Sequence, residues 1–291
     1  MSLTKPLARQ PVEVDRFGPP LFTRLLGSSI TAGTWLVTLA FFFPVLWMLL
    51  TSFKHESAAA TRPPTLFTGY TLEQYRSVFD SGILPFALNS VMTSLISVSI
   101  VLVLALPAAY ALSIRPIGRW QDGLFFFLST KMLPSSAALA AIYVLTQELH
   151  LLDTVWVLVL LYTTMNLPIA IWMLRSFLLE IPLEVIEAAK VDGAGFVRSL
   201  WSVILPILAP GMGACALICF IFAWNEFFFA VNLTSTRAAT MPLFLVGFIT
   251  SEGLFWARLS AAATLCALPV VIAGWIAQNK LVRGLSLGAV K

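Results

Sequence analysis

The sequence predicts an all-α integral membrane protein with six transmembrane helices. Of its 291 residues, 59% are hydrophobic and only 11% are charged, whereas soluble domains carry about 25% charged residues. The mean hydropathy is +0.90. Six stretches reach the roughly 20 apolar residues that a helix needs to cross a bilayer. No polar linker divides the chain, so we expect one transmembrane domain over residues 1–291.

The first three predicted spans differ in how uniformly apolar they are. The first, at about 30–52, holds three consecutive phenylalanines, and the second, at about 86–113, is rich in Val, Leu and Ile. The third, at about 123–146, is the least uniform, because Lys131 and the sequence MLPSS interrupt it.

The last three predicted spans lie at about 154–175, 207–232 and 258–279. They contain the three cysteines of the chain, Cys215 and Cys219 in the fifth span and Cys266 in the sixth. With no His or Asp near them, these cysteines are typical of small packing residues. We expect no metal site.

Lysine and arginine predict the orientation, because cytoplasmic loops carry an excess of both. One set of loops contains Lys5, Arg9, Arg16, Arg24, Arg115, Arg119, Arg175, Lys190, Arg198, Lys280, Arg283 and Lys291. The opposite set contains only Lys54, Arg62, Arg76, Arg237 and Arg258. Both termini are therefore predicted to be cytoplasmic. In the largest outside loop, at about 53–85, apolar residues at 72, 75, 78 and 79 predict a short helix over 71–79.

The segment at about 181–206 lies between the fourth and fifth spans, on the predicted cytoplasmic side. Pro182 is suited to the start of a helix, and Gly193 can end it in a left-handed conformation. A second helix is expected from Phe196, with Pro206 at the start of the fifth span. The small Ala188 and Ala189 permit close approach. The residues alone fit either an amphipathic connector at the lipid headgroups or a docking element for a cytoplasmic protein.

The sequence lacks the motifs of an enzyme. It contains no GxxxxGK[ST] loop that would cradle the phosphates of ATP, and no nucleophile paired with a base. We therefore expect no catalytic centre, and any ATP-derived energy must come from another chain.

The 181–206 segment resembles the EAA loop of ABC-importer permeases. Glu187, Ala188 and Ala189 are followed after three residues by Gly193 and after nine more by VILP at 203–206, where Val203 replaces the usual Ile. The resemblance extends over nearly the whole chain to the maltose-type branch of carbohydrate permease subunits. It is carried by LNSV at 88–91, FAWNEF at 222–227 and the tail at 279–291. The sequences TKMLP at 130–134 and LLDT at 151–154 are most similar to the subset for sugar alcohols and glycosides.

This resemblance implies the type I ABC importer permease fold, in a bacterial inner membrane. It further implies a homologous second permease subunit, two ATPase subunits and an extracytoplasmic binding protein as partners. ATP and Mg²⁺ would bind the ATPases, and this chain would bind no cofactor. The residues implied in coupling to the ATPase are Glu187, Ala188, Ala189, Asp192, Gly193, Leu205 and Pro206.

Polar side chains inside spans are candidates for the substrate path. A charged residue at the bilayer centre costs roughly 2.5–3.5 kcal/mol on insertion scales, so it is expected to face the interior, a pore or a partner. Sugar sites combine aromatic faces with hydrogen-bonding groups. The candidates with these chemistries are Tyr162, Asn166, Trp224, Asn225, Glu226 and Lys131. Their alternative role is to join helices by interhelical hydrogen bonds.

Two other functions stay open at this point. An ion-gradient-driven secondary transporter would need intramembrane carboxylates as relays, for which Glu226 is the strong candidate. A non-transporting membrane scaffold or sensor would need neither a relay nor a path.

Overall fold

The computed structural model describes residues 21–61, 63–65, 69–114, 118–250 and 253–287. The described residues are helical apart from turns and a hairpin of two two-residue strands, β1 (Ile249–Thr250) and β2 (Gly253–Leu254). The chain divides into two compact units, residues 1–48 and 49–291. The sequence-based expectation of one transmembrane domain stays a prediction.

Most of the helix α1 (Leu21–Ser52) belongs to the first unit. Its part from Ser29 to Ser52 is long and apolar enough to cross a membrane, which agrees with the first predicted span. Large apolar side chains on this part are exposed, Phe41 to 81%. This exposure suits a helix whose solvent is lipid.

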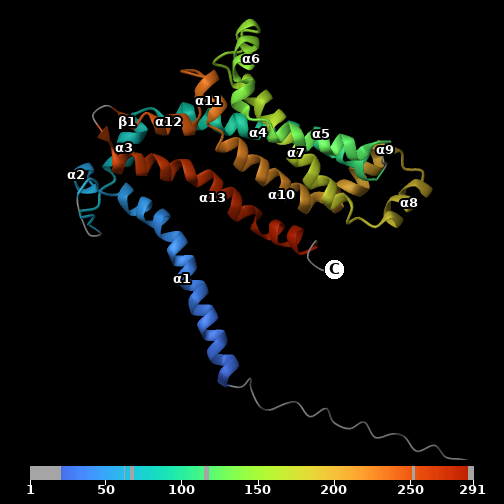
Figure 1. Cartoon of the computed structure of the whole chain (residues 1–291), viewed down its shortest axis with the longest axis horizontal. Helices are drawn as coiled ribbons and strands as arrows, with labels where there is room; N and C mark the ends of the chain where they lie inside the picture. Colours follow the sequence, from blue (N-terminus) through green and yellow to red (C-terminus); the bar gives the residue numbers. More distant parts are fainter. Residues whose placement is uncertain (1–20, 62, 66–68, 115–117, 251–252, 288–291) are drawn as a thin grey trace, which may run out of the picture. The chain divides into compact units, whose positions relative to one another are not determined.

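Four long helices run through the second unit: α4 (Ile83–Ser113), α7 (Val155–Leu178), α10 (Leu205–Trp224) and α13 (Trp256–Leu287). They lie side by side (Figure 1), with α4 packed against α7 and α10, and α10 against α13. Small residues permit this packing. A Cβ atom on Gly211 of α10 would lie 2.7 Å from the ring of Phe177 in α7.

The third predicted span is broken. Helices α5 (Trp120–Met132) and α6 (Ser135–Glu148) meet at an angle of 87°. Leu133 is extended, because a residue before proline is disfavoured in the α region, and Pro134 then caps α6. The span predicted at about 123–146 is therefore present as a bent pair of helices and not as one straight helix. The described residues hold five continuous candidate spans, or six if the bent pair is one span.

The fifth predicted span differs at both ends. Its helix stops at Trp224, Asn225 caps it, and α11 (Phe228–Leu233) follows, so 207–232 is not one helix. At the other end, a π-helical segment, η1 (Ser199–Ile204), joins α10 to the short α9 (Phe196–Arg198). Pro206 has no N–H and its ring crowds the preceding turn. The helix nevertheless continues from η1 into α10 without a break, and we attribute this to the wider π turn before Pro206.

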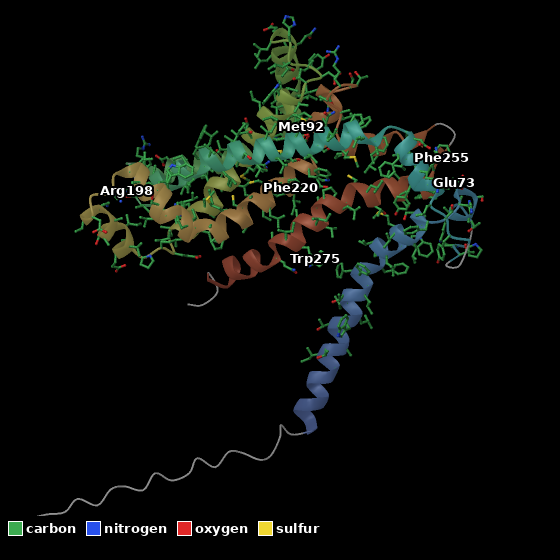
Figure 2. All side chains as sticks on the ribbon, turned by 180° about the vertical axis from the view of Figure 1, so that it is seen from behind. Glu73, Met92, Arg198, Phe220, Phe255 and Trp275 are labelled. Atoms are coloured by element: carbon green, nitrogen blue, oxygen red, sulfur yellow. The ribbon has the colours of Figure 1, made fainter. Side chains whose placement is uncertain are left out.

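Short elements occupy the two ends of the second unit. The helices α2 (Glu56–Ala59), α3 (Glu73–Asp80) and α12 (Met241–Val246) lie opposite α8 (Leu183–Val191) and α9 (Figure 1). Figure 2 shows Glu73 and Arg198 at these opposite ends.

The helix α3 confirms the short helix predicted at 71–79, and its outside location stays a prediction. On its predicted apolar face, Val78 is fully buried and Tyr75 is half-buried. Leu72 and Phe79 are each 59% exposed, and Gln74 is buried in their place. Only the middle of the apolar face therefore packs against the bundle.

Candidate functional site

The segment between α7 and α10 is a helix, a glycine turn and a second helix. Helix α8 ends in a Schellman motif: the Gly193 N–H donates to the Lys190 carbonyl at 3.0 Å, and the Ala194 N–H donates to the Ala189 carbonyl at 2.9 Å. Gly193 has φ +74°, so the predicted left-handed conformation is confirmed. The second helix begins at Phe196, as expected.

One side of this loop is buried in its own protein. Ile186, Leu200 and Ile204 are 2%, 5% and 1% exposed, and they join the core formed by α4, α7 and α10. Ala189 is also buried, whereas its neighbour Ala188 is exposed. Of the two alanines expected to permit a partner's approach, only Ala188 is therefore on the open side.

The open side of the loop mixes charged and apolar groups. Val191 is 88% exposed and Trp201 is 56% exposed. Pro206 is exposed and Leu205 half-buried in the first turn of α10. The exposed charged residues are Glu184, Glu187, Lys190, Asp192 and Arg198.

Two substrate-path candidates, Tyr162 and Asn166, lie in the N-terminal half of α7, and a third, Glu226, follows α10. Tyr162 and Asn166 are fully buried one helical turn apart. The Glu226 carboxylate accepts the N–H groups of Phe229 at 3.0 Å and Ala230 at 3.4 Å. The Tyr162 ring packs in the same buried cluster as Phe229 and Ala230. The Asn166 amide donates to the Cys219 carbonyl of α10 at 3.5 Å. The group thus ties α7 to α10 and to the start of α11.

Trp224 and Asn225 have separate surroundings. The Trp224 indole is buried and donates to the Cys266 carbonyl of α13 at 3.0 Å. The Asn225 side chain is exposed and donates to the Ile221 carbonyl of its own helix at 2.8 Å. Trp224 therefore joins two helices, and Asn225 remains the accessible polar group at this turn.

Lys131 lies at the broken span, on the rim of a cavity of about 300 Å³. Its ammonium donates to the Met165 carbonyl at 3.1 Å and lies 5.5 Å from the centre of the Phe222 ring. Among the described residues, no carboxylate forms an ion pair with it. The cavity wall is mostly apolar, and Lys131 is the one charged group among the described residues of that wall. Thr130, Ser135, Thr164 and Phe229 also line it.

Asp153 has an organising role that no local sequence pattern indicated. Its carboxylate accepts four consecutive backbone N–H groups in the turn between α11 and α12, at 2.9–3.2 Å. Burial alone would raise the pKa of Asp153, but these hydrogen bonds together outweigh it and hold the pKa below its usual range. The donors are Ser235, Thr236, Arg237 and Ala238.

Asp153→Asn is expected to lower the free energy of unfolding by about 1–2 kcal/mol, a range discounted for the partial exposure of the group. Because the folded-state pKa is depressed, the stabilisation is complete above the unfolded pKa of about 4 and is lost as the pH falls through the folded value. The deficit of the variant should therefore be constant from about pH 8 to pH 5. Thermal unfolding of the purified protein at several pH values measures it.

Asp122→Asn is the matched control, because Asp122 pairs with Arg119 at 2.7 Å with both side chains largely exposed. Such pairs contribute little to stability. Equal losses in the two variants would contradict a special role for Asp153.

Comparison with known proteins places the chain among permeases. Residues 66–286 match the family model described as binding-protein-dependent transport system inner membrane component. A probable ABC transporter permease protein, y4oR of Sinorhizobium fredii, is 36% identical over 252 residues, covering 86% of this chain and 91% of that one. The diacetylchitobiose uptake system permease protein DasC of Streptomyces coelicolor is 33% identical over 252 residues, with the same coverages.

A solved structure has the same fold. The crystal structure of a bacterial ABC transporter involved in the import of the acidic polysaccharide alginate matches with a TM-score of 0.74 and 20% identity, over 90% of this chain and 98% of that one. The expected type I ABC importer permease architecture is confirmed at the level of the helices.

Proposed function

The chain belongs to the family of binding-protein-dependent transport system inner membrane components, and from that premise we propose that it translocates a sugar, sugar alcohol or small glycoside. As a member of this family it is a multi-pass membrane permease and not an enzyme, as the sequence predicts. The sugar class is supported by the uptake of diacetylchitobiose named for one relative and by the maltose-type sequence motifs.

In this proposal the chain works with four kinds of partner: a homologous permease subunit, two ATPase subunits, an extracytoplasmic binding protein and the surrounding lipid. The ATPases bind ATP and Mg²⁺, and this chain binds no cofactor. The family description, which makes transport depend on a binding protein, supports the third partner.

The loop from α8 to η1 is the proposed docking element for an ATPase subunit. Two features of the loop support this proposal. A left-handed Gly193 forms the turn between its two helices. One side of the loop is buried in the protein, and the other side exposes both charged and apolar side chains. Glu187 is positioned for a charge-assisted contact, and Ala188 leaves room beside it. With this loop cytoplasmic, both termini would also be cytoplasmic and α3 would face outward.

Substrate is proposed to pass the polar groups at the outer half of α7 and the cavity beside Lys131. The ion-gradient alternative gains no support, because Glu226 is engaged by amides of α11 rather than placed in a relay of carboxylates. Nothing in the family match favours a non-transporting scaffold.

Reconstitution of the complete transporter in liposomes tests this function. Uptake of a radiolabelled disaccharide panel should require ATP on the ATPase side and the binding protein on the other. It should persist when ionophores collapse all ion gradients. Uptake that survives without ATP but stops with the ionophores would overturn the proposal.

A further inference from the structure

The docking loop is linked by backbone to two of the long helices but not to α4. Its first helix, α8, follows α7 after only four residues, and its second helix runs through η1 into α10. A displacement of the loop is therefore transmitted to α7 and α10 along the chain. For α4, which packs along both, such a displacement must arrive through side chains.

A pair of aromatic rings connects the loop to α4. The centre of the Phe196 ring, in α9, lies 5.3 Å from that of Tyr110 in the last turns of α4, and the rings meet edge to face at 72°. Tyr110 is 3% exposed, whereas Phe196 is 46% exposed. Phe196 therefore belongs to both sides of the loop: part of it contacts α4 and part remains open.

The end of α4 beside this pair is held firmly. The Arg175 side chain of α7 donates to the Leu112 carbonyl at 3.4 Å and stacks on the Trp120 ring at 4.5 Å. The contact between Phe196 and Tyr110 thus acts on a helix end that also contacts α5 and α7 through Arg175.

The opposite end of α4 holds the segment before α12. The Asn89 amide donates to the carbonyls of Arg237 at 2.9 Å and Ala239 at 3.0 Å, and the Met241 N–H donates to the Ser90 hydroxyl at 2.8 Å. Twenty residues separate Ser90 from Tyr110, which corresponds to roughly 30 Å of helix. One continuous helix therefore joins the docking end to the outer end (Figure 1).

We propose that the Tyr110–Phe196 contact is a joint through which movement of the docking loop reaches the end of α4, beside the buried core that the loop shares with that helix. These two positioning residues would then influence how much solute is moved per ATP hydrolysed. This inference rests on the proposed function. It concerns coupling rather than docking, because the buried ring of Tyr110 cannot touch an ATPase subunit.

A double-mutant cycle in the complete reconstituted transporter tests the joint. Tyr110→Ala, in the buried partner of the pair, should leave subunit assembly and ATP hydrolysis within about twofold of wild type and should lower uptake per ATP by roughly two- to thirtyfold. Phe196→Ala removes a ring of the docking loop itself, so its uptake per ATP is measured only in complexes that assemble, where it should fall to the same extent. Because one contact is removed in both cases, the double variant should be no worse than either single variant. Tyr110→Phe, which keeps the ring, should behave as wild type.

Val197→Ala is the matched control, since Val197 adjoins Phe196 and is 64% exposed. Two results would overturn the joint: an unchanged ratio of uptake to hydrolysis in both single variants, or losses that multiply in the double variant. If the alanine variants fail to assemble, Tyr110→Leu and Phe196→Leu give the same readout with the volume retained. A wild-type complex without any ATP-dependent uptake would instead refute the proposed function.

Discussion

Gly193→Val is expected to abolish ATP-dependent uptake and to prevent co-purification of the ATPase subunits. Gly193 has φ +74°, where a left-handed backbone costs an L-residue roughly 1–2 kcal/mol and a β-branched one more. No atom lies within 4 Å of the position that a Cβ would occupy, so the effect comes from the backbone alone. The turn would open, α8 and α9 would separate, and the docking surface would be lost.

Two substitutions isolate this cause. Gly193→Asn should retain most of the activity, because asparagine tolerates the left-handed region. Gly195→Ala should behave as wild type, because Gly195 has φ −68° and equally open surroundings. Co-purification of the ATPase and uptake in proteoliposomes measure all three variants. Normal assembly and uptake in Gly193→Val would remove the loop from the docking proposal.

Apolar runs, glycines and prolines predicted the features of this fold that depend on local sequence. The first, second, fourth and sixth spans agree with α1, α4, α7 and α13, because an apolar run long enough to span a bilayer is itself the signal. The left-handed turn at Gly193 was predictable because a glycine placed just after a helix is the residue of choice there. The docking loop could thus be outlined from its sequence.

Features that depend on distant contacts were not predictable. The pairing of Asp153 with the turn at 235–238 joins residues more than 80 positions apart. The hydrogen bond from Trp224 to the Cys266 carbonyl similarly gives a predicted path residue a packing role. The π segment before Pro206 and the 87° break before Ser135 have a proline as their visible sign. A proline indicates that a helix is disturbed, but not whether it bends, widens or continues.

Glu226→Ala is expected to lower uptake roughly tenfold or more, equivalent to at least 1.4 kcal/mol, while subunit assembly stays normal. The carboxylate accepts N–H groups from Phe229 and Ala230, so it fixes the turn between α10 and α11, whose Phe229 and Ala230 pack with Tyr162 of α7. Without it, the turn that carries Asn225 loses its position beside the proposed path. Glu226→Gln, which retains one acceptor oxygen, should fall between the alanine variant and wild type.

Asn225→Ala tests whether the same turn contacts substrate directly, and we expect it also to lower uptake with assembly retained. Its control is Asn232→Ala. Both asparagines are exposed, and both amides donate to the carbonyl four residues back, at 2.8 Å and 2.7 Å. The two substitutions therefore remove the same local hydrogen bond, and only the first removes a side chain beside Glu226. A rise in the KM for uptake in Asn225→Ala alone would indicate contact with the solute. Wild-type kinetics in both Asn225→Ala and Glu226→Ala would exclude this turn from the substrate path. The cavity beside Lys131 would then be the remaining candidate for the path on this chain.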